Sequence, residues 1–374
     1  MSALFLTGLI NFLENLNMSV HPYITDSIEL LKRMIAVPSF SREEQGVAAL
    51  LEDFFKRNGL DYYQRKGNNL WIRSKYYSEK SPTILLNSHI DTVQPSSGWT
   101  SDPFSPKEED DKITGLGSND AGASVVSLLA AFRMLEEKKH PCNFIFSATA
   151  EEEISGEEGV ASILDQLGPV DLGVVGEPTR MQMAVAEKGL MVLDGTVKGK
   201  SGHAARDEGI NAIYEAIPVI EWFRNYQFPL QSEFLGPVKM TVTGIGAGSQ
   251  HNVVPDVCRF MVDIRVNEHY KNEELFQLIR QHVNCELKAR SFRLNSSSVS
   301  VNHPFVKRGE ELGLEKFGSP TTSDQARMPF TTVKIGPGDS SRSHTSDEFI
   351  RPSEIVEGVK IYHQLLDNLH IYSI

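Results

Sequence analysis

The sequence is poor in cysteine and has fewer basic than acidic residues. Three cysteines among 374 residues are an odd number and lie far apart, which excludes a disulfide framework or a thiolate metal cluster and fits a reducing cytoplasm. The 37 Lys and Arg residues against 49 Asp and Glu residues give a net charge of −12. Because phosphate recognition needs a basic surface, we expect no nucleic-acid partner.

Long apolar runs are also missing. The apolar stretch Ala3–Ile10 is too short to span a bilayer, and no Lys or Arg precedes Lys32, so the basic region of a signal peptide is absent. We therefore expect an amphipathic leader, with Met18 as an alternative start, a cytoplasmic location and no membrane partner. The 40% hydrophobic and 23% charged residues exclude a disordered, collagen-like or coiled-coil chain, and the length suggests two domains.

Strands alternate with helices in the first half of the chain. The patterns predict helices over Asp26–Ala36, Glu43–Asn58 and Ala121–Glu137, and strands over Asn69–Arg73, Thr83–Asn87, Asn143–Thr149 and Leu172–Gly176. This alternation is typical of an α/β domain with a mostly parallel central sheet.

The pattern changes after Pro178. Strands are predicted over Leu190–Val197, Lys239–Gly244, Val257–Val266 and Glu286–Leu294, and helices over Asn211–Asn225 and Asn272–Val283. The order β-α-β-β-α-β is that of a ferredoxin-like α+β unit. We predict that residues 181–297 form an inserted domain and that residues 1–180 and 298–374, ending in a helix near Pro352–Leu369, form one discontinuous catalytic domain.

Polar residues follow several of the predicted strands. His89 and Asp91 are two apart, so they project to one side of an extended chain, and a carboxylate can fix the tautomer of a metal-binding imidazole. Alone, this pair is weak evidence for a site. Glu177 follows another apolar strand, at the end of a parallel sheet where open α/β folds bind ligands.

Three further motifs each have an ordinary alternative. Asp120 follows a glycine-rich turn and could simply cap a helix, and Glu151-Glu152-Glu153 could be a solvated acidic turn. His344 could be a surface-loop histidine. Taken together, however, the motifs supply two histidines and three carboxylates, one of them able to bridge. That is a ligand set for two zinc-like ions at about 3.5–4 Å.

With these motifs the chain resembles the acetylornithine deacetylase / succinyl-diaminopimelate desuccinylase family, and more widely the aminoacylase and di-zinc carboxypeptidase group. The resemblance extends from about Ile28 to the C-terminus. The motifs that carry it, in family order, are His89-x-Asp91, Gly117-x-x-Asp120, Glu152-Glu153, Gly176-Glu177-Pro178-Thr179, Ser201-Gly202-His203-Ala204 and His344-x-x-Asp347-Glu348.

The resemblance implies two zinc ions per subunit, for which cobalt may substitute. It assigns one ion to His89, Asp120 and Glu177. The other ion falls to Asp120, Glu153 and His344. Asp91 is expected to orient His89, Glu152 to act as the general base and Glu151 to lie outside the site. A cis peptide bond is expected between Asp120 and Ala121.

The same resemblance makes the inserted domain a lid and homodimerisation domain. His203 is then expected to enter the active site of the other subunit, and Asn252 and Arg265 to bind substrate. Arg265 could instead be a solvated residue of an alternating strand. The chain departs from many relatives in Asp120-Ala-Gly-Ala-Ser124, where a lysine is missing. This leaves the substrate less certain.

The activity implied is metal-dependent hydrolysis of the amide bond of an N-acyl-L-amino acid. N-acetyl-L-ornithine, a substrate of arginine biosynthesis, is the expected substrate. N-succinyl-ornithine, N-acetylcitrulline and succinyl-diaminopimelate stay open, as does a di-zinc dipeptidase or aminopeptidase. A peptide-binding relative without metal is a further alternative, against which the complete set of ligand residues counts.

Overall fold

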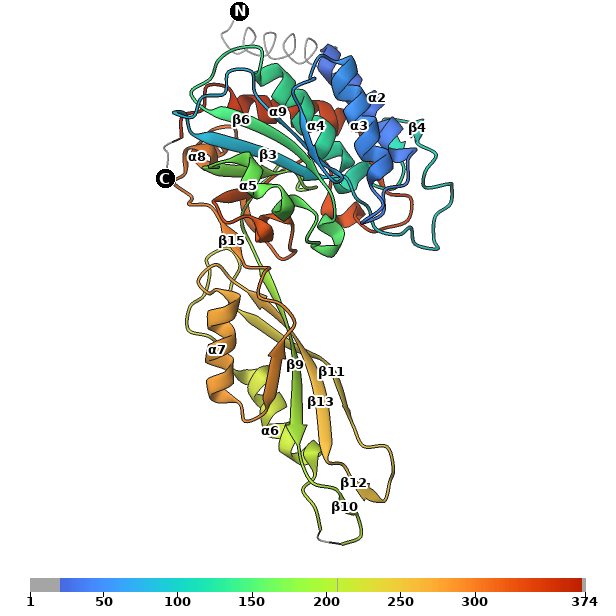
Figure 1. Cartoon of the computed structure of the whole chain (residues 1–374), viewed down its shortest axis with the longest axis vertical. Helices are drawn as coiled ribbons and strands as arrows, with labels where there is room; N and C mark the ends of the chain where they lie inside the picture. Colours follow the sequence, from blue (N-terminus) through green and yellow to red (C-terminus); the bar gives the residue numbers. More distant parts are fainter. Residues whose placement is uncertain (1–20, 207, 372–374) are drawn as a thin grey trace, which may run out of the picture. The chain divides into compact units, whose positions relative to one another are not determined.

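The computed structural model describes residues 21–206 and 208–371, which form two compact units (Figure 1). The first unit contains the chain up to Val185, then Val299–Phe317, and then the chain from Ser323 onward. The second unit contains Ala186–Ser298 and Gly318–Thr322. The expected leader and the alternative start at Met18 lie outside the described residues.

A mixed sheet forms the centre of the first unit. Its strand order is β1-β2-β6-β3-β7-β17-β8-β15, with β16 beside β8. The middle strands β6, β3, β7 and β17 are parallel neighbours, whereas the flanking pairs are antiparallel. The strands are β1 (Gln64–Lys66), β2 (Asn69–Arg73), β3 (Thr83–His89), β6 (Asn143–Thr149), β7 (Leu172–Val175), β8 (Met183–Glu187), β15 (Ser297–Ser298), β16 (Lys316–Ser319) and β17 (Thr332–Lys334).

Burial explains why the middle strands are apolar without alternation. Every residue of β3 and β6 is buried, as expected for parallel strands covered on both faces. The predicted α/β architecture with a mostly parallel sheet is confirmed. Helices cover the sheet (Figure 1): α2 (Pro22–Ile35), α3 (Gln45–Arg57), α4 (Ala123–Leu135), α5 (Leu164–Leu167), α8 (Pro304–Glu311) and α9 (Pro352–Leu366).

Helix α4 is the most deeply buried of these helices. All but one of its residues are buried, and it contacts α2, α9 and β3. A helix that is apolar all round fits such a position. The sequence pattern predicts its start at Ala121, but the regular helix begins at Ala123, because Asp120 and Ala121 have non-helical backbone angles in the turn Ser118–Gly122.

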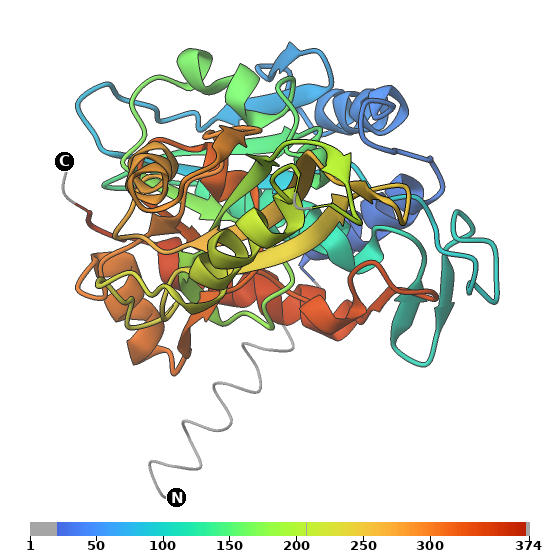
Figure 2. The ribbon, with the colours of Figure 1, turned by 90° about the horizontal axis from the view of Figure 1, so that it is seen from below.

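A small antiparallel sheet joins two distant parts of the first unit. The hairpin of β4 (Lys107–Glu109) and β5 (Lys112–Thr114) is completed by β18 (Phe349–Ile350), which pairs with β5 (Figure 2). The chain that follows β5 leads to Asp120, and the chain that precedes β18 carries His344. The pairing therefore brings these two candidate ligands to the same region.

The second unit is an antiparallel sheet with two helices. The strand order in the sheet is β11-β13-β9-β14. Along the chain, these strands and the two helices follow the order β-α-β-β-α-β, which is the predicted ferredoxin-like arrangement. Alternate residues of β9 are buried, so one face of the sheet meets the helices in an apolar core. The elements are β9 (Gly189–Lys198), β10 (Gly202–His203), α6 (Ala212–Asn225), β11 (Lys239–Ala247), β12 (Val253–Val254), β13 (Val257–Val266), α7 (Asn272–His282) and β14 (Glu286–Ala289).

One strand of the second unit is shorter than predicted. The strand predicted over Glu286–Leu294 ends at Ala289, where its pairing with β9 stops. The three cysteines are free thiols. Among residues 21–206 and 208–371, no helix combines the length and the apolar character needed to cross a membrane.

Candidate active site

Candidate ligands collect at one edge of the parallel sheet. His89 is the last residue of β3, the acidic run Glu151–Glu153 follows the end of β6, and Glu177 lies two residues beyond β7. Because these strands run parallel, their carboxyl ends meet at the same edge. Asp120 arrives from the turn before α4 and His344 from the loop before β18. The fold thus brings together the six residues to which the sequence assigns metal ligation or base catalysis.

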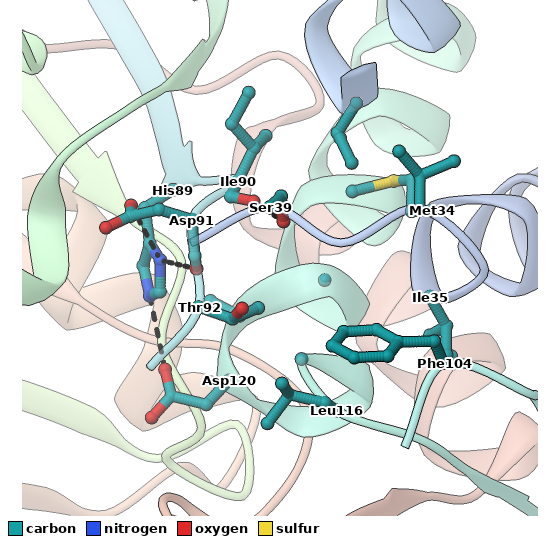
Figure 3. A pocket seen from close by; sticks show the side chains of 15 residues that line it. Met34, Ile35, Ser39, His89, Ile90, Asp91, Thr92, Phe104, Leu116 and Asp120 are labelled. Atoms are coloured by element: carbon teal, nitrogen blue, oxygen red, sulfur yellow. Dashed lines mark hydrogen bonds and ion pairs between the residues drawn. The ribbon is translucent and has the colours of Figure 1, made fainter. Parts of the chain in front are cut away.

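The buried ring of His89 lies between two aspartates (Figure 3). Its Nδ1 is 3.0 Å from the backbone oxygen of Asp91 and 3.4 Å from that residue's Oδ1. Its Nε2 is 3.1 Å from Asp120 Oδ1 and 3.7 Å from Glu177 Oε1. A proton held at Nδ1 by Asp91 leaves the Nε2 lone pair directed at the carboxylates, which is the tautomer that a metal ligand needs.

Asp120 also faces the second histidine. His344 Nε2 is 3.6 Å from Asp120 Oδ2 and 3.0 Å from Glu153 Oε2. The two oxygens of Asp120 therefore point to different imidazoles, Oδ1 toward His89 and Oδ2 toward His344. The peptide bond between Asp120 and Ala121 is cis, as the resemblance implies.

The charges of this cluster are unbalanced without a cation. Burial raises the pKa of Glu152 well above its usual value, and the carboxylates of Glu177 and Asp324 raise that pKa further, against the opposing charge of His89. Burial alone would lower the pKa of His89, but hydrogen bonds with Asp120 and Asp91 hold that pKa well above normal. Both effects arise because many carboxylates share one buried space.

The donor set fits divalent metal ions. Among the described residues, no Lys or Arg forms an ion pair with Asp120, Glu152 or Glu153. Two triads each place one donor atom per residue within 4.8 Å of the others, namely His89 with Glu152 and Glu177, and His89 with Asp120 and Glu153. Imidazole nitrogens and carboxylate oxygens in this number are the ligands that zinc accepts.

Asp91 links the first histidine to the acidic run. Its Oδ1 accepts a hydrogen bond from the backbone N–H of Glu152 at 3.0 Å, and its Oδ2 accepts one from Glu153 at 3.1 Å. Ser41 Oγ donates to Oδ2 at 2.7 Å. Burial opposes ionisation of Asp91, but the hydrogen bonds with His89 and Ser41 outweigh it and lower the pKa. One ionised carboxylate thus orients both a candidate ligand and the candidate base.

Glu151 differs from its two neighbours. Its backbone N–H donates to Glu44 Oε1 at 3.1 Å, and its own Oε2 accepts from the N–H of Glu158 at 3.2 Å. Its carboxylate is therefore held by its own loop and by Arg42, whose Nε lies 3.8 Å from Glu151 Oε1. Glu152 Oε2, in contrast, lies 4.0 Å from His89 Nε2. This arrangement supports the register in which Glu152 is the base and Glu153 the ligand.

Several residues at the site escaped the sequence reasoning. The Glu348 carboxylate accepts hydrogen bonds from three backbone N–H groups just before α4, those of Gly117 (3.0 Å), Asn119 (2.8 Å) and Asp120 (2.8 Å). Glu348 does stand in a motif of the resemblance, but the motif gives it no role. Burial and the charge of Asp120 raise the pKa of Glu348 to about 7. Glu44, Ser41 and Asp324 carried no local signal at all.

A narrow pocket borders the metal-ligand candidates (Figure 3). His89, Asp91 and Asp120 lie on one side of it, and the apolar side chains of Phe104 and Leu116 lie on the other. Apolar walls exclude water, which strengthens electrostatic interactions among the polar groups.

The predicted residues of the inserted domain fall into two groups. His203 pairs with Val253 across β10 and β12, and the N–H of Ala204 donates to the backbone oxygen of Asn252 at 3.0 Å, so His203 and Asn252 are neighbours. Arg265 stands near the far end of β13, where its guanidinium makes two hydrogen bonds to Asp263, at 2.9 and 3.1 Å. At about 3.3 Å per residue, the length of β13 separates the two groups by roughly 25 Å.

Metal binding should release protons. The hydrogen bond with Glu153 raises the pKa of His344 to about 9. At pH 7, His344 of the metal-free protein is therefore protonated, and it must lose this proton before it can bind a metal ion. Since the raised pKa favours the protonated form below pH 9, apparent metal affinity should fall as pH falls, about tenfold per unit for each displaced proton. Calorimetry of zinc binding in buffers of different ionisation enthalpy measures the protons released. The His344→Ala variant should release fewer protons when it binds zinc. A zinc affinity that does not change with pH would contradict the prediction.

Comparisons with known proteins identify the family of this chain. A sequence profile of peptidase family M20/M25/M40 matches residues 85–368. A succinyl-diaminopimelate desuccinylase of Dechloromonas aromatica (strain RCB) is 28% identical over 382 residues, covering 92% of this chain and 98% of that protein.

Two solved structures share the fold. Aminopeptidase PepT from Bacillus cereus ATCC 10987 superposes with a TM-score of 0.73 at 18% identity, covering 92% of this chain and 98% of that one. The YXEP protein of Bacillus subtilis, described as a dinuclear metal binding peptidase, gives a TM-score of 0.69 at 16% identity, with 92% and 97% covered. The profile matches well over half of the chain, and the chain therefore belongs to peptidase family M20/M25/M40.

Proposed function

We propose that this protein is a dinuclear metal-dependent hydrolase that cleaves the amide bond of an N-acyl amino acid whose acyl group carries a carboxylate. The observation that carries the proposal is Asp120, whose two oxygens face His89 and His344 separately. One zinc ion would be held by His89, Asp120 and Glu177, the other by Asp120, Glu153 and His344. Cobalt would serve in place of zinc.

The chain's own residues then divide the chemistry. When bound, such ions act as Lewis acids and lower the pKa of water. Glu152 takes a proton from the attacking water on its carboxylate and passes it to the leaving nitrogen. Asp91 keeps His89 and the backbone of Glu152 in place during this transfer.

Positive charge in the second unit supports an acidic substrate. Lys239 is the direct cross-strand partner of Arg265. Lys188 lies close to both residues, and its pKa is lowered first by burial and then by the positive charges of Lys239 and Arg265. Asp263 pairs with Arg265, so the cluster keeps an excess of positive charge through Lys188 and Lys239. Such an excess suits a substrate with several carboxylates. N-acetyl-L-ornithine, the substrate expected from the sequence, carries a cationic side chain instead. The relative named a succinyl-diaminopimelate desuccinylase also favours the succinyl alternative, and neither observation supports a role in arginine biosynthesis.

A substrate panel tests the proposal. Zinc-loaded and cobalt-loaded protein is assayed for amine release from N-succinyl-L,L-diaminopimelate, N-succinyl-L-ornithine, N-acetyl-L-ornithine, N-acetyl-L-citrulline and dipeptides. We expect kcat/KM for succinyl substrates to exceed that for acetyl substrates by at least about 100-fold, since a site built for a carboxylate rejects analogues that lack it. A preference for dipeptides would replace the proposal with a peptidase. No hydrolysis by metal-loaded protein would overturn it.

We further propose that the active protein is a homodimer through the inserted domain. His203 and Asn252 stand at one end of β13 and Arg265 at the other, so one copy of this domain cannot bring all three to one small substrate. A partner's copy, related by a two-fold axis, would supply the first pair. Exposed apolar side chains on the second unit support such a contact, because patches of this kind mark protein interfaces. They include Ile210, Tyr214 (68% exposed), Ile217 and Ile245 (61% exposed).

Subunit exchange checks the shared site. Mixing inactive His203→Ala protein with inactive Glu152→Ala protein yields heterodimers that have one intact site, so activity should return to about a quarter of the wild-type value after random exchange. The control is a mixture of Asp120→Asn protein with Glu152→Ala protein. Both changes affect the site that a subunit forms with its own first unit, so each site of the heterodimer carries one of them and the mixture should stay inactive. Lasting inactivity of the first mixture after proven exchange would place His203 elsewhere.

A further inference from the structure

Asp324 is a buried acidic residue that the proposed chemistry does not use. It opens the short turn Asp324–Arg327, directly after the chain re-enters the first unit at Ser323. Its side chain is buried, and among the described residues no Lys or Arg pairs with it. Burial raises its pKa to about 6. Because a buried carboxylate without a cationic partner is unfavourable for folding, its presence needs another explanation.

The hydrogen bonds of Asp324 end on the two strands that lead into the active site. Asn87 Nδ2 donates to Asp324 Oδ2 at 2.8 Å, and Thr149 Oγ1 donates to the same oxygen at 2.9 Å. Asn87 Oδ1 in turn accepts from Ser147 Oγ at 2.6 Å. Asn87 and Ser147 are register partners in the parallel pair β3–β6, and so are His89 and Thr149. Asp324 is the acceptor on which this buried network converges.

The network lies immediately behind the reacting groups. Beyond Asn87, β3 ends at His89, and beyond Thr149 the chain enters the acidic run. The N–H of Ile90 donates to the backbone oxygen of Thr149 at 2.8 Å, so the two strand ends are tied to each other just in front of the network. A shift of either strand end would move His89 relative to Glu152.

We propose that Asp324 is a positioning residue of the active site, whose carboxylate locks the ends of β3 and β6 together through Asn87 and Thr149 and thereby fixes His89 against Glu152. The inference rests on the proposed metal-dependent hydrolysis. Buried networks of hydrogen bonds between side chains rigidify the elements that they join. Mutation of a group that holds a metal ligand in place typically lowers metal affinity or activity 10- to 100-fold. We expect a loosened strand end to have an effect of this size.

Three variants test the role. Asp324→Leu removes the acceptor, Thr149→Val removes one donor with little change of shape, and Asp324→Asn keeps one acceptor oxygen but removes the charge. We expect Asp324→Leu to lower kcat and zinc affinity about 10- to 100-fold at unchanged KM. Thr149→Val should have a smaller effect of the same kind. The double variant, which combines Asp324→Leu with Thr149→Val, should be no worse than Asp324→Leu alone, because both changes remove the same link.

A second measurement does not depend on activity. In metal-free protein, hydrogen exchange of the peptide that contains Ile90 should accelerate in Asp324→Leu and Thr149→Val. The matched control is Asp171→Asn, because Asp171 accepts from the N–H of Thr83 at the opposite end of β3, 2.8 Å away. This control should leave kcat, KM and exchange at Ile90 as in the wild type.

The outcomes separate two failures. If wild-type protein binds no metal and hydrolyses no substrate, the proposed function fails before any variant is compared. If the wild type is active but Asp324→Leu, Asp324→Asn and Thr149→Val keep wild-type kcat and exchange at Ile90, Asp324 has no positioning role. Should Asp324→Leu fail to fold, Thr149→Val and Asp324→Asn still decide between these results.

Discussion

Asp120→Asn should lose both metal ions and lower kcat/KM on the order of 10⁴-fold or more, the size of loss seen when a residue central to a catalytic unit is removed. The reason lies in the two faces of the carboxylate, with Oδ1 at 3.1 Å from His89 Nε2 and Oδ2 at 3.6 Å from His344 Nε2. Asparagine offers one neutral oxygen and one N–H donor, so it cannot serve as a ligand on both sides.

The metal content of dialysed protein and the rate of amide hydrolysis measure this outcome together. Asp102→Asn is a suitable control, since it makes the same chemical change in an exposed loop of the first unit, where the Asp102 side chain accepts from the N–H of Phe104 at 3.0 Å. That variant should keep both ions and full activity. Two retained ions in Asp120→Asn would show that Asp120 does not bridge.

The positions of the strand-end residues were predictable because the signal is local. Each of β3 and β6 contains an apolar run, Ile84–Leu86 and Phe144–Phe146, so the polar residues that follow it stand out in the sequence, as His89 does. Parallel order then places such ends at one edge. The ferredoxin-like order of the second unit was predictable for a similar reason, because alternating strands such as β9 differ clearly from amphipathic helices.

Short elements and distant partners gave no such signal. β17 has three residues and β8 five, too few for a pattern to separate them from a loop. The two side chains that donate hydrogen bonds to Asp324, those of Asn87 and Thr149, lie 237 and 175 residues away in the sequence. The tertiary fold creates this neighbourhood, and no spacing rule within one segment contains it.

The substrate lay beyond the sequence for a different reason. The metal-ligand candidates belong to the first unit, whereas the cations that we propose to bind an acidic substrate, Lys188, Lys239 and Arg265, belong to the second. Lys188 and Arg265 are 77 positions apart, and only the pairing of β9 and β13 makes them neighbours. The resemblance implies substrate binding by Arg265, but its motifs contain neither Lys188 nor Lys239.

Within the acidic run, Glu152→Gln should keep both metal ions and lower kcat by about 10²- to 10⁴-fold, the range for loss of a general base. Glu153→Gln should instead lose one ion, because Glu153 Oε2 lies 3.0 Å from His344 Nε2 on the side of the second candidate ion. Glu151→Gln is the matched control, since the Glu151 carboxylate contacts the N–H of Glu158 in its own loop.

The three variants are isosteric and adjacent, so they distinguish base, ligand and bystander under one set of conditions. Metal content per chain separates Glu153→Gln from the others, and single-turnover rates at saturating substrate separate Glu152→Gln from Glu151→Gln. The backbone contacts of Asp91 with Glu152 and Glu153 are unaffected by these side-chain changes, so His89 should stay in place in all three. A large loss of kcat with full metal content in Glu151→Gln, and not in Glu152→Gln, would move the general base one residue toward the N-terminus.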